Sequence, residues 1–292
     1  MTSDTKERKC HVACVQMRSG VDIEANVDAA STMIRQAAGR GANVVATPEM
    51  TALLDIRPGR TRAKAVAEDK DRALQDFQRL AEELGIWLLV GSHAVTSEHD
   101  ERLANRSFLL APDGRVHARY DKIHMFDVEV GDGQSYRESK AYCPGTTATL
   151  AETPIATIGM TICYDLRFPN LYRVLAQAGA EILMCPSAFT RVTGRSHWHT
   201  LLKARAIETG SFIIAPAQGG DHDDGRETFG HSMIISPWGD VLAEANGEEP
   251  GIITAEIDLA AVAEARARIP SLSLENPIRV TGFTLAKDEK GC

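Results

Sequence analysis

The sequence has few of the features that mark disulfide-rich, zinc-binding or membrane-spanning proteins. Its six cysteines show no paired spacing such as Cys-x-x-Cys, which argues against a disulfide scaffold and against a zinc ribbon. No stretch approaches the roughly 18 uninterrupted apolar residues of a membrane helix. The short polar N-terminus lacks the apolar run of a signal peptide. We therefore expect a cytoplasmic protein with reduced thiols and no membrane partner.

The sequence also lacks an excess of basic residues, internal repeats and linkers rich in Ser or Pro. Its 32 basic and 40 acidic side chains give a net charge of −8 at pH 7. This charge repels phosphate backbones and anionic membrane surfaces, so we expect no nucleic-acid partner.

The composition that remains is that of an ordinary globular protein. The chain has 292 residues, of which 43% are hydrophobic, 25% charged and 5% aromatic. Single α/β domains commonly reach this length. We expect one folded domain over residues 10–284, between a disordered N-terminal arm, residues 1–9, and a flexible C-terminal tail, residues 285–292.

Apolar and β-branched runs alternate with helical patterns along the chain. The expected strands are residues 12–17, 43–47, 86–92, 107–111, 155–162, 181–185, 212–217, 232–236 and 251–257. The expected helices are residues 23–39, 71–84, 171–178 and 197–209. Residues 106–120 indicate a β-hairpin around the turn Pro-Asp-Gly. This order predicts a strand-rich, layered α/β fold in which helices cover mostly parallel central strands.

Three residues with reactive side chains follow predicted strands, where parallel sheets place functional groups. Glu49 follows the second strand, Lys122 the hairpin and Cys163 the strand that ends at residue 162. Taken alone, each has an ordinary explanation: a solvated glutamate, a surface lysine and a small buried cysteine. Together they supply a base, an ammonium group and a nucleophile.

The segments around these residues closely resemble the three signature segments of the nitrilase superfamily of carbon–nitrogen hydrolases, in the same order. They are PEM at Glu49, YDKIHMFD at Lys122 and GMTICYDLRFPNLYR at Cys163, and the resemblance spans about residues 10–284. It implies a four-layer αββα sandwich that assembles into dimers or larger homo-oligomers. It also implies hydrolysis of linear amides without a cofactor or a metal ion.

The resemblance assigns roles to individual residues. Cys163 attacks the amide carbonyl carbon to form a thioester, and Glu49 carries the protons. Lys122 and the backbone N–H of Tyr164 stabilise the oxyanion, and Glu138, in GQSYRES, orients Lys122 and the substrate. A carboxylate that acts as a base near neutral pH is normally too acidic, so we expect burial to raise the pKa of Glu49 while Lys122 offsets this effect.

The downstream segments resemble one branch of the superfamily, the deaminated glutathione amidases, and the neighbouring ω-amidases. They are PSAFTRVTGRSHWHTLLKARAIE and AQGGDHDDGRETFGHSMIISPWGDVL. These enzymes act on monoamides of 2-oxo dicarboxylic acids, so a carboxylate-bearing substrate is expected. Phe189 and Thr190 follow a strand end and are candidates for the acyl pocket. We hypothesise that Arg167 and Thr190 contact the oxo-acid end, although Arg167 has an equally plausible structural role.

Several alternatives stay open at this point. A Cys–His hydrolase would use His124 or His231 as the base for Cys163. Another small amide, an N-carbamoyl compound or a nitrile could be the substrate, and an inactive homologue could act as a binding protein. The basic residues of the segment 57–64 form a solvated face or attract anionic substrates. A metal site would draw on a histidine- and aspartate-rich set: His197, His199, His222, Asp223, Asp224 and His231.

Overall fold

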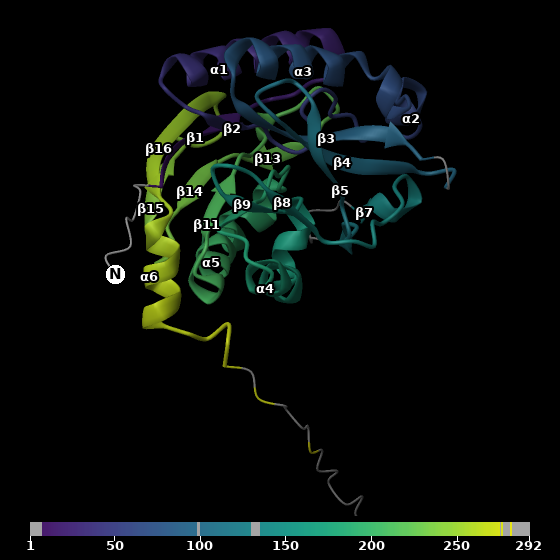
Figure 1. Cartoon of the computed structure of the whole chain (residues 1–292). Coiled ribbons are helices and arrows are strands. Elements are labelled where there is room, and N and C mark those ends of the chain that lie inside the picture. The colour runs from purple at the N-terminus through teal and green to yellow at the C-terminus, as the bar shows by residue number, and fades with distance from the viewer. Residues whose placement is uncertain (1–7, 98–99, 130–134, 275, 277–280, 282–292) are drawn as a thin grey trace, which may run out of the picture.

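Two six-stranded sheets face each other, and a layer of helices covers the outer face of each (Figure 1). The computed structural model describes residues 8–97, 100–129, 135–274, 276 and 281. Helices α1 and α3 cover one sheet, and α4 and α5 cover the other. The four layers confirm the expected αββα sandwich.

The first sheet contains the N-terminal half of the fold and one late strand. Its order is β16 (Gly251–Asp258), β1 (Lys9–Gln16), β2 (Val44–Ala46), β3 (Trp87–Thr96), β4 (Leu103–Leu110) and β5 (Val116–Asp121). Strands β1, β2 and β3 are parallel, whereas β16 and the β4–β5 hairpin pair antiparallel at the two edges.

The second sheet repeats this plan with the C-terminal half. Its order is β15 (Val241–Glu244), β14 (Met233–Ile235), β11 (Phe212–Ala215), β10 (Ile182–Met184), β9 (Thr157–Met160) and β8 (Thr149–Glu152). The central strands β9, β10 and β11 are parallel, and the outer strands pair antiparallel.

The helices of the outer layers have clear start and stop signals. They are α1 (Ile23–Gly39), α3 (Arg72–Leu84), α4 (Pro169–Gln177) and α5 (Arg191–Thr209). The side chains of Asp22, Asp71 and Thr190 cap the N-termini of α1, α3 and α5 by accepting backbone hydrogen bonds. Gly85 and Gly210 end α3 and α5 in the left-handed conformation that favours glycine.

The alternation of side chains along the strands separates two hydrophobic cores. In β1, Val12 and Cys14 are buried in the core between the two sheets, whereas Ala13 and Val15 are buried beneath α1 and α3. Both faces of the central strands are therefore covered, and this explains why the strands read as nearly continuous apolar runs.

The remaining elements lie outside the four layers. They are α2 (Arg60–Lys64), the 3₁₀ turns η1 (Glu68–Lys70), η2 (Glu138–Lys140) and η3 (Cys163–Arg167), the hairpins β6 (Asp127–Glu129) with β7 (Ser135–Arg137) and β12 (Gly219–Asp221) with β13 (Glu227–Phe229), and α6 (Ala260–Arg268). These two hairpins, together with β8, β15, α2 and α6, were not expected from the sequence. Every strand and helix that was expected is present, with α5 six residues longer at its start than the predicted segment 197–209.

The expected N-terminal arm differs from the structure at its end. Lys9 already belongs to β1, where it pairs with Asp258, and the guanidinium of Arg8 forms an ion pair with Glu181 at 2.7 Å. Residues 1–7 and the expected tail, residues 285–292, lie outside the described residues. Within the described ranges, no helix combines the length and the apolar character needed to cross a bilayer.

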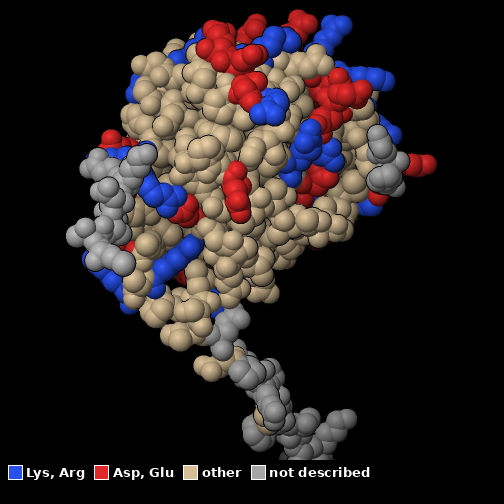
Figure 2. Space-filling model, in the orientation of Figure 1, with Lys and Arg blue, Asp and Glu red and all other residues tan. Residues whose placement is uncertain are grey.

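Charged side chains of both signs are mixed around α1 and α3 on the face that Figure 2 shows. A broad area below them carries few charges. Large apolar side chains that are exposed lie mostly on α4, α5 and the segments after β14 and α6; they include Val174, Val192, Ile207, Trp238, Ile269 and Leu274.

Candidate active site

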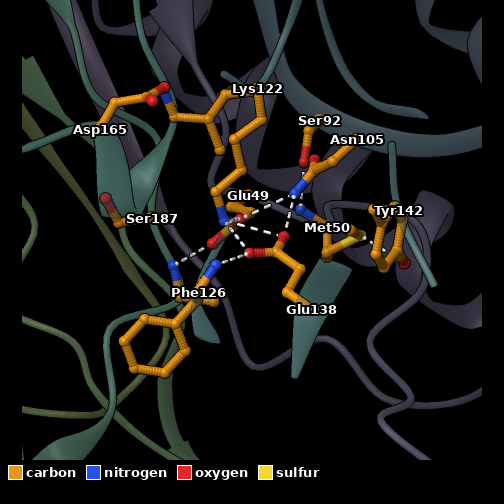
Figure 3. A network of polar contacts seen from close by, with 12 residues as sticks. Glu49, Met50, Ser92, Asn105, Lys122, Phe126, Glu138, Tyr142, Asp165 and Ser187 are labelled. Atoms are coloured by element: carbon orange, nitrogen blue, oxygen red, sulfur yellow. Dashed lines mark hydrogen bonds and ion pairs between the residues drawn. The ribbon is translucent and has the colours of Figure 1, made fainter. Parts of the chain in front are cut away.

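Loops that follow β2, β5 and β9 converge between the two sheets and bring Glu49, Lys122 and Cys163 together (Figure 3 shows the polar network). Glu49 and Lys122 come from the first sheet, and Cys163 comes from the second. The three candidate catalytic residues predicted from strand ends therefore share one site, and Glu138 lies beside them.

A tight turn after β2 presents Glu49. Met50, which follows it, has a φ of 56°, and its N–H donates to Ser92 Oγ at 2.9 Å. Gly91 in β3 lies so close to this turn that a Cβ atom there would be 2.1 Å from the carbonyl oxygen of Thr47. The side chain of Gln218 donates to the Glu49 carbonyl oxygen at 3.0 Å. These contacts fix the backbone from which the carboxylate projects.

Both oxygens of the Glu49 carboxylate are held. Oε1 lies 2.9 Å from Nζ of Lys122 and 2.9 Å from Nδ2 of Asn105. Oε2 accepts the backbone N–H of Ala188 at 2.9 Å. The carboxylate is 6% exposed, so its position is set by protein donors rather than by bulk water.

Lys122 is a buried ammonium between two carboxylates. Its side chain is 2% exposed, and Nζ lies 2.9 Å from Glu49 Oε1 and 2.9 Å from both oxygens of Glu138. Burial alone would lower the pKa of Lys122, but the charges of Glu138 and Glu49 raise this pKa well above its ordinary value. Lys122 is therefore cationic at neutral pH.

Cys163 occupies a strained position at the start of η3. Its φ is 48°, a left-handed conformation that is rare outside glycine, and its N–H donates to the carbonyl oxygen of Pro186 at 3.0 Å. Burial, the charge of Glu49 and a hydrogen bond to Glu49 together raise the pKa of the Cys163 thiol well above its ordinary value, although Lys122 acts in the opposite direction. At neutral pH the sulfur is therefore a thiol beside the Glu49 carboxylate.

The pKa of Glu49 differs in sign from the sequence-based expectation. Burial does push it upward, but the charge of Lys122 and hydrogen bonds from Lys122, Cys163 and Asn105 bring the pKa of Glu49 below its ordinary value. The expectation of a raised pKa was wrong because it assumed that Lys122 cancels only part of the effect of burial on Glu49. With Glu49 ionised and Cys163 protonated, the pair is set to transfer a proton only when the sulfur begins to form a bond.

Asn105 is a site residue that the sequence analysis missed. It lies in β4, is fully buried, and its Nδ2 donates to Glu49 at 2.9 Å and to Glu138 at 3.3 Å. Its backbone carbonyl oxygen accepts the backbone N–H of Lys122 at 3.0 Å. A polar residue inside the apolar strand LANRSFLL is the signal that could have identified it.

Buried Asp165 organises the turn that carries Cys163. Its carboxylate accepts the Tyr120 hydroxyl at 2.7 Å, the N–H of Ile162 at 2.8 Å, and both the N–H and Nδ1 of His124, at 3.1 and 2.7 Å. The ring of His124 also stacks on Phe168, with centroids 3.5 Å apart. Because Nδ1 of His124 is bound to Asp165 and Glu49 already contacts the thiol, the geometry does not support His124 as the base for Cys163.

A cavity of about 600 Å³ opens above the three central residues. Tyr164, Phe189 and Thr190 line it, as expected for residues near a substrate. Arg167 is not among the residues that line it. Its guanidinium lies over the rings of Phe189 and Tyr164, at 5.2 and 5.9 Å, and Nη1 lies 3.2 Å from His197 Nδ1. These contacts favour the structural role of Arg167 over the substrate-binding role.

The wall of the cavity carries several cations. From the basic segment 57–64, Arg57 and Arg62 line it, and four further residues join them: Arg102, Arg137, Lys140 and Arg226. The cavity therefore suits a substrate with negative charge, an outcome that the sequence analysis left open for the basic segment.

Two of the histidines considered for a metal site do come together, with a partner that was not considered. Nε2 of His199 lies 2.9 Å and Nδ1 of His231 lies 2.7 Å from Oε1 of Glu244. Buried His222 instead contacts the Ser19 carbonyl and the Thr228 hydroxyl, at 2.8 and 2.7 Å. His231 is thus engaged with Glu244, and none of these three histidines lines the cavity that holds Cys163.

Comparisons with known proteins agree with this geometry. A family profile described as carbon-nitrogen hydrolase matches residues 11–267. A protein of Synechocystis sp. named deaminated glutathione amidase is 40% identical over 264 residues, which are 89% of this chain and 96% of the relative. One of the same name from Yersinia enterocolitica is 39% identical over 91% of this chain and 92% of its own length. The crystal structure of the C. elegans NitFhit protein matches with a TM-score of 0.84 and 35% identity, over 91% of this chain and 65% of that one.

Proposed function

Because this chain belongs to the carbon–nitrogen hydrolase family, we propose that Cys163, Glu49 and Lys122 are its catalytic residues and that they cleave an amide through a thioester on Cys163. Membership confirms the resemblance found in the sequence, and the chain is a hydrolase of carbon–nitrogen bonds in small amides. The observation that carries the proposal is the placement of Cys163 beside a Glu49 carboxylate that Lys122 and Asn105 hold at 2.9 Å.

In the first step, the sulfur of Cys163 attacks the amide carbonyl carbon while Glu49 takes the thiol proton. The carbonyl oxygen becomes an oxyanion, and Lys122 Nζ with the backbone N–H of Tyr164 provides the donors that stabilise it. Glu49 then gives its proton to the departing amine, and the carbon–nitrogen bond breaks. An acyl-thioester and a free amine result.

In the second step, water replaces the amine in the site. Glu49 takes a proton from this water as its oxygen attacks the thioester carbon, and the same donors stabilise the second oxyanion. The carbon–sulfur bond then breaks, the thiol recovers its proton and the acid product leaves. Glu138 keeps Lys122 in position through both steps, which is consistent with its bidentate contact at 2.9 Å.

We propose deaminated glutathione as the substrate, with 2-oxoglutarate and the cysteinylglycine dipeptide as products. Two relatives with this name are 39 and 40% identical over nine tenths of the chain. A cavity of about 600 Å³ with a cationic wall provides room and charge for a peptide-sized dicarboxylate. The second candidate is α-ketoglutaramate, whose hydrolysis releases ammonia; it shares the 2-oxo acid half but lacks the dipeptide.

We also propose that the protein acts as a homo-oligomer in the cytoplasm. The exposed apolar side chains of α4 and α5, among them Val174, Val192 and Ile207, provide a surface that a second copy of the chain would cover. A nucleophilic thiol functions in a reducing compartment, and the described cysteines form no disulfide. Light scattering at several protein concentrations tests the assembly.

The experiment that tests the function supplies purified protein with deaminated glutathione, α-ketoglutaramate and simple nitriles in parallel. Released 2-oxoglutarate or ammonia gives kcat/KM for each compound. A preference of at least tenfold for deaminated glutathione supports the proposal, and a preference for α-ketoglutaramate moves the enzyme to the ω-amidases. A trapped thioester on Cys163 without turnover of these compounds would retain the chemistry but reject the substrate.

A further inference from the structure

One arginine in the wall of the cavity has an unsatisfied buried donor. Arg226 lines the same cavity as Cys163, and its Nε is buried without a hydrogen-bond partner. Within the described part of the chain, no carboxylate forms an ion pair with its guanidinium. A cation that lines a binding cavity without a carboxylate partner from the protein is a candidate site for an anionic group of the substrate.

The other arginines of the wall differ from Arg226: exposed Arg62 donates to the carbonyl oxygen of Glu101, and the remaining three form ion pairs with carboxylates. Arg57 forms an ion pair with Asp55 at 2.7 Å, and Arg102 forms one with Asp100 at 2.7 Å. Arg137 is paired with Glu129 at 2.7 Å. Their charges are thus neutralised by the protein itself, whereas the charge of the half-buried Arg226 is not.

The backbone around Arg226 is held firmly, so its side chain projects from a fixed base. Its N–H donates to Asp224 Oδ1 at 2.9 Å, and its carbonyl oxygen accepts the N–H of His222 at 2.9 Å. Asp224 Oδ2 in turn accepts the N–H of Ile56 at 2.7 Å, which ties this turn to another wall of the cavity. Thr228, two residues further, pairs with Thr190 on a third wall.

The charges at the reacting centre explain why a second cation is needed. Glu49 and Glu138 carry two negative charges against the single positive charge of Lys122, so the centre as a whole is anionic. A substrate carboxylate would be repelled there and has to be bound elsewhere in the cavity. A guanidinium matches a carboxylate with two parallel hydrogen bonds, and the two terminal nitrogens of Arg226, which are not enclosed as Nε is, can provide them.

We infer that Arg226 binds the substrate carboxylate and thereby selects 2-oxo acid amides over neutral amides. This inference rests on the proposed function, and it assigns to Arg226 the carboxylate that deaminated glutathione and α-ketoglutaramate share. Nε itself is enclosed by protein, so the terminal nitrogens of Arg226 are the donors that the substrate carboxylate would meet.

A substrate pair tests the inference. Kinetics of wild type, Arg226→Gln and Arg226→Lys are compared on α-ketoglutaramate and on glutaramide, a neutral diamide of similar length. For Arg226→Gln we expect KM for α-ketoglutaramate to rise at least tenfold with kcat changed less than threefold, and both constants for glutaramide to stay within threefold. Arg226→Lys should retain part of the preference. A loss of equal size on both substrates, or no loss, overturns the inference.

The matched control is Lys203→Gln. Lys203 lies on α5, is exposed and does not line the cavity, so this variant removes one positive charge without changing the wall. It should leave KM for α-ketoglutaramate within a factor of two. An equal rise of KM in Lys203→Gln and Arg226→Gln would show that only the overall field matters, and would reject a specific contact of Arg226.

A second readout separates this inference from the proposed function because it needs no turnover. Iodoacetamide alkylates Cys163, and mass spectrometry follows the rate with and without 2-oxoglutarate, the acid product. In wild type, saturating 2-oxoglutarate should slow alkylation at least fivefold, and in Arg226→Gln the concentration that gives half of this protection should rise at least tenfold. If wild type is protected but hydrolyses no 2-oxo acid amide, the proposed function fails and the role of Arg226 stands. Protection that is equal in both proteins, or absent from both, overturns the inference.

Discussion

Both carboxylate oxygens of Glu138 lie 2.9 Å from Nζ of Lys122. Oε2 of Glu138 also accepts the N–H of Phe126 at 2.7 Å, so the glutamate is fixed from the backbone side as well. Figure 3 shows how Glu49 and Asn105 complete this cluster. Among the described residues, Lys122 is thus the one cation between buried Glu49 and partly buried Glu138. Five predictions concern this cluster and its neighbours.

Replacing Lys122 by methionine should damage both stability and catalysis. Two buried carboxylates would lose their cation, which costs about 3–5 kcal/mol of unfolding free energy. Loss of an oxyanion donor should lower kcat about 10²–10³-fold. Urea denaturation and initial rates measure the two effects. Adding Glu138→Gln to Lys122→Met should recover part of the stability but none of the activity; recovered activity would contradict a role of Lys122 in the reaction.

Cys163→Ala should abolish turnover, because no other described side chain replaces the nucleophile. The matched control is Cys10→Ala, since the Cys10 thiol donates to Asn43 Oδ1 at 3.3 Å and neither residue lines the described cavity. Rates on the best amide substrate and thioester trapping by mass spectrometry measure the outcome. More than trace hydrolysis by Cys163→Ala would reject the thioester mechanism.

The pH dependence should show the signature of a carboxylate base. Since the pKa of Glu49 is below its ordinary value of about 4.3, kcat/KM should stay constant from pH 8 down to about pH 5 and fall only below that. Recovery of activity on return to pH 7 controls for unfolding. An acid limb centred near pH 6.5 would instead indicate a histidine base, and its loss in His124→Asn would identify that base.

The lowered pKa of Glu49 also affects the stability of the folded state. A carboxylate whose folded pKa lies below its unfolded value stabilises the native state above the unfolded pKa. This contribution is lost as the pH falls through the folded value. Wild type should therefore lose more unfolding free energy than Glu49→Gln between pH 6 and pH 3, measured by urea denaturation. Equal losses in the two proteins would argue against the lowered pKa.

Asp165→Asn should displace Cys163 without touching the substrate. The variant replaces a buried carboxylate that accepts four hydrogen bonds by an amide that accepts at one oxygen only. We expect a loss of about 2–4 kcal/mol in unfolding free energy and a fall in kcat of at least tenfold with little change in KM. Exposed Asp240, which accepts a hydrogen bond from Ser236 at 3.3 Å, gives the matched control, Asp240→Asn. A rise in KM alone would contradict the positioning role.

The strands and the central residues were predictable from the sequence because their signals are local. Apolar runs marked the buried strands, and reactive residues that directly follow them placed Glu49, Lys122 and Cys163 at the sheet edges. Segments such as β6 and β7 carry only three residues each and have no apolar alternation, so they were not found.

Features that depend on contacts between distant segments were not predictable. Asn105 joins two glutamates that are 56 and 33 residues away, and the pKa of Glu49 depends on a lysine 73 residues away. Arg167 was expected near substrate from its position after Cys163, yet its guanidinium packs on Phe189 and Tyr164. Which way a side chain turns at the end of a strand is decided by these neighbours.

The reacting groups and the cavity wall come from different kinds of structure. Glu49, Lys122 and Cys163 are anchored at the ends of sheet strands, whereas Arg226 and much of the wall belong to turns and hairpins. Such segments accept substitutions, insertions and deletions more readily than strands do. Mutation and selection can therefore alter the substrate specificity without disturbing the residues that hydrolyse the amide. A library restricted to the wall would redirect this enzyme with little risk to its chemistry.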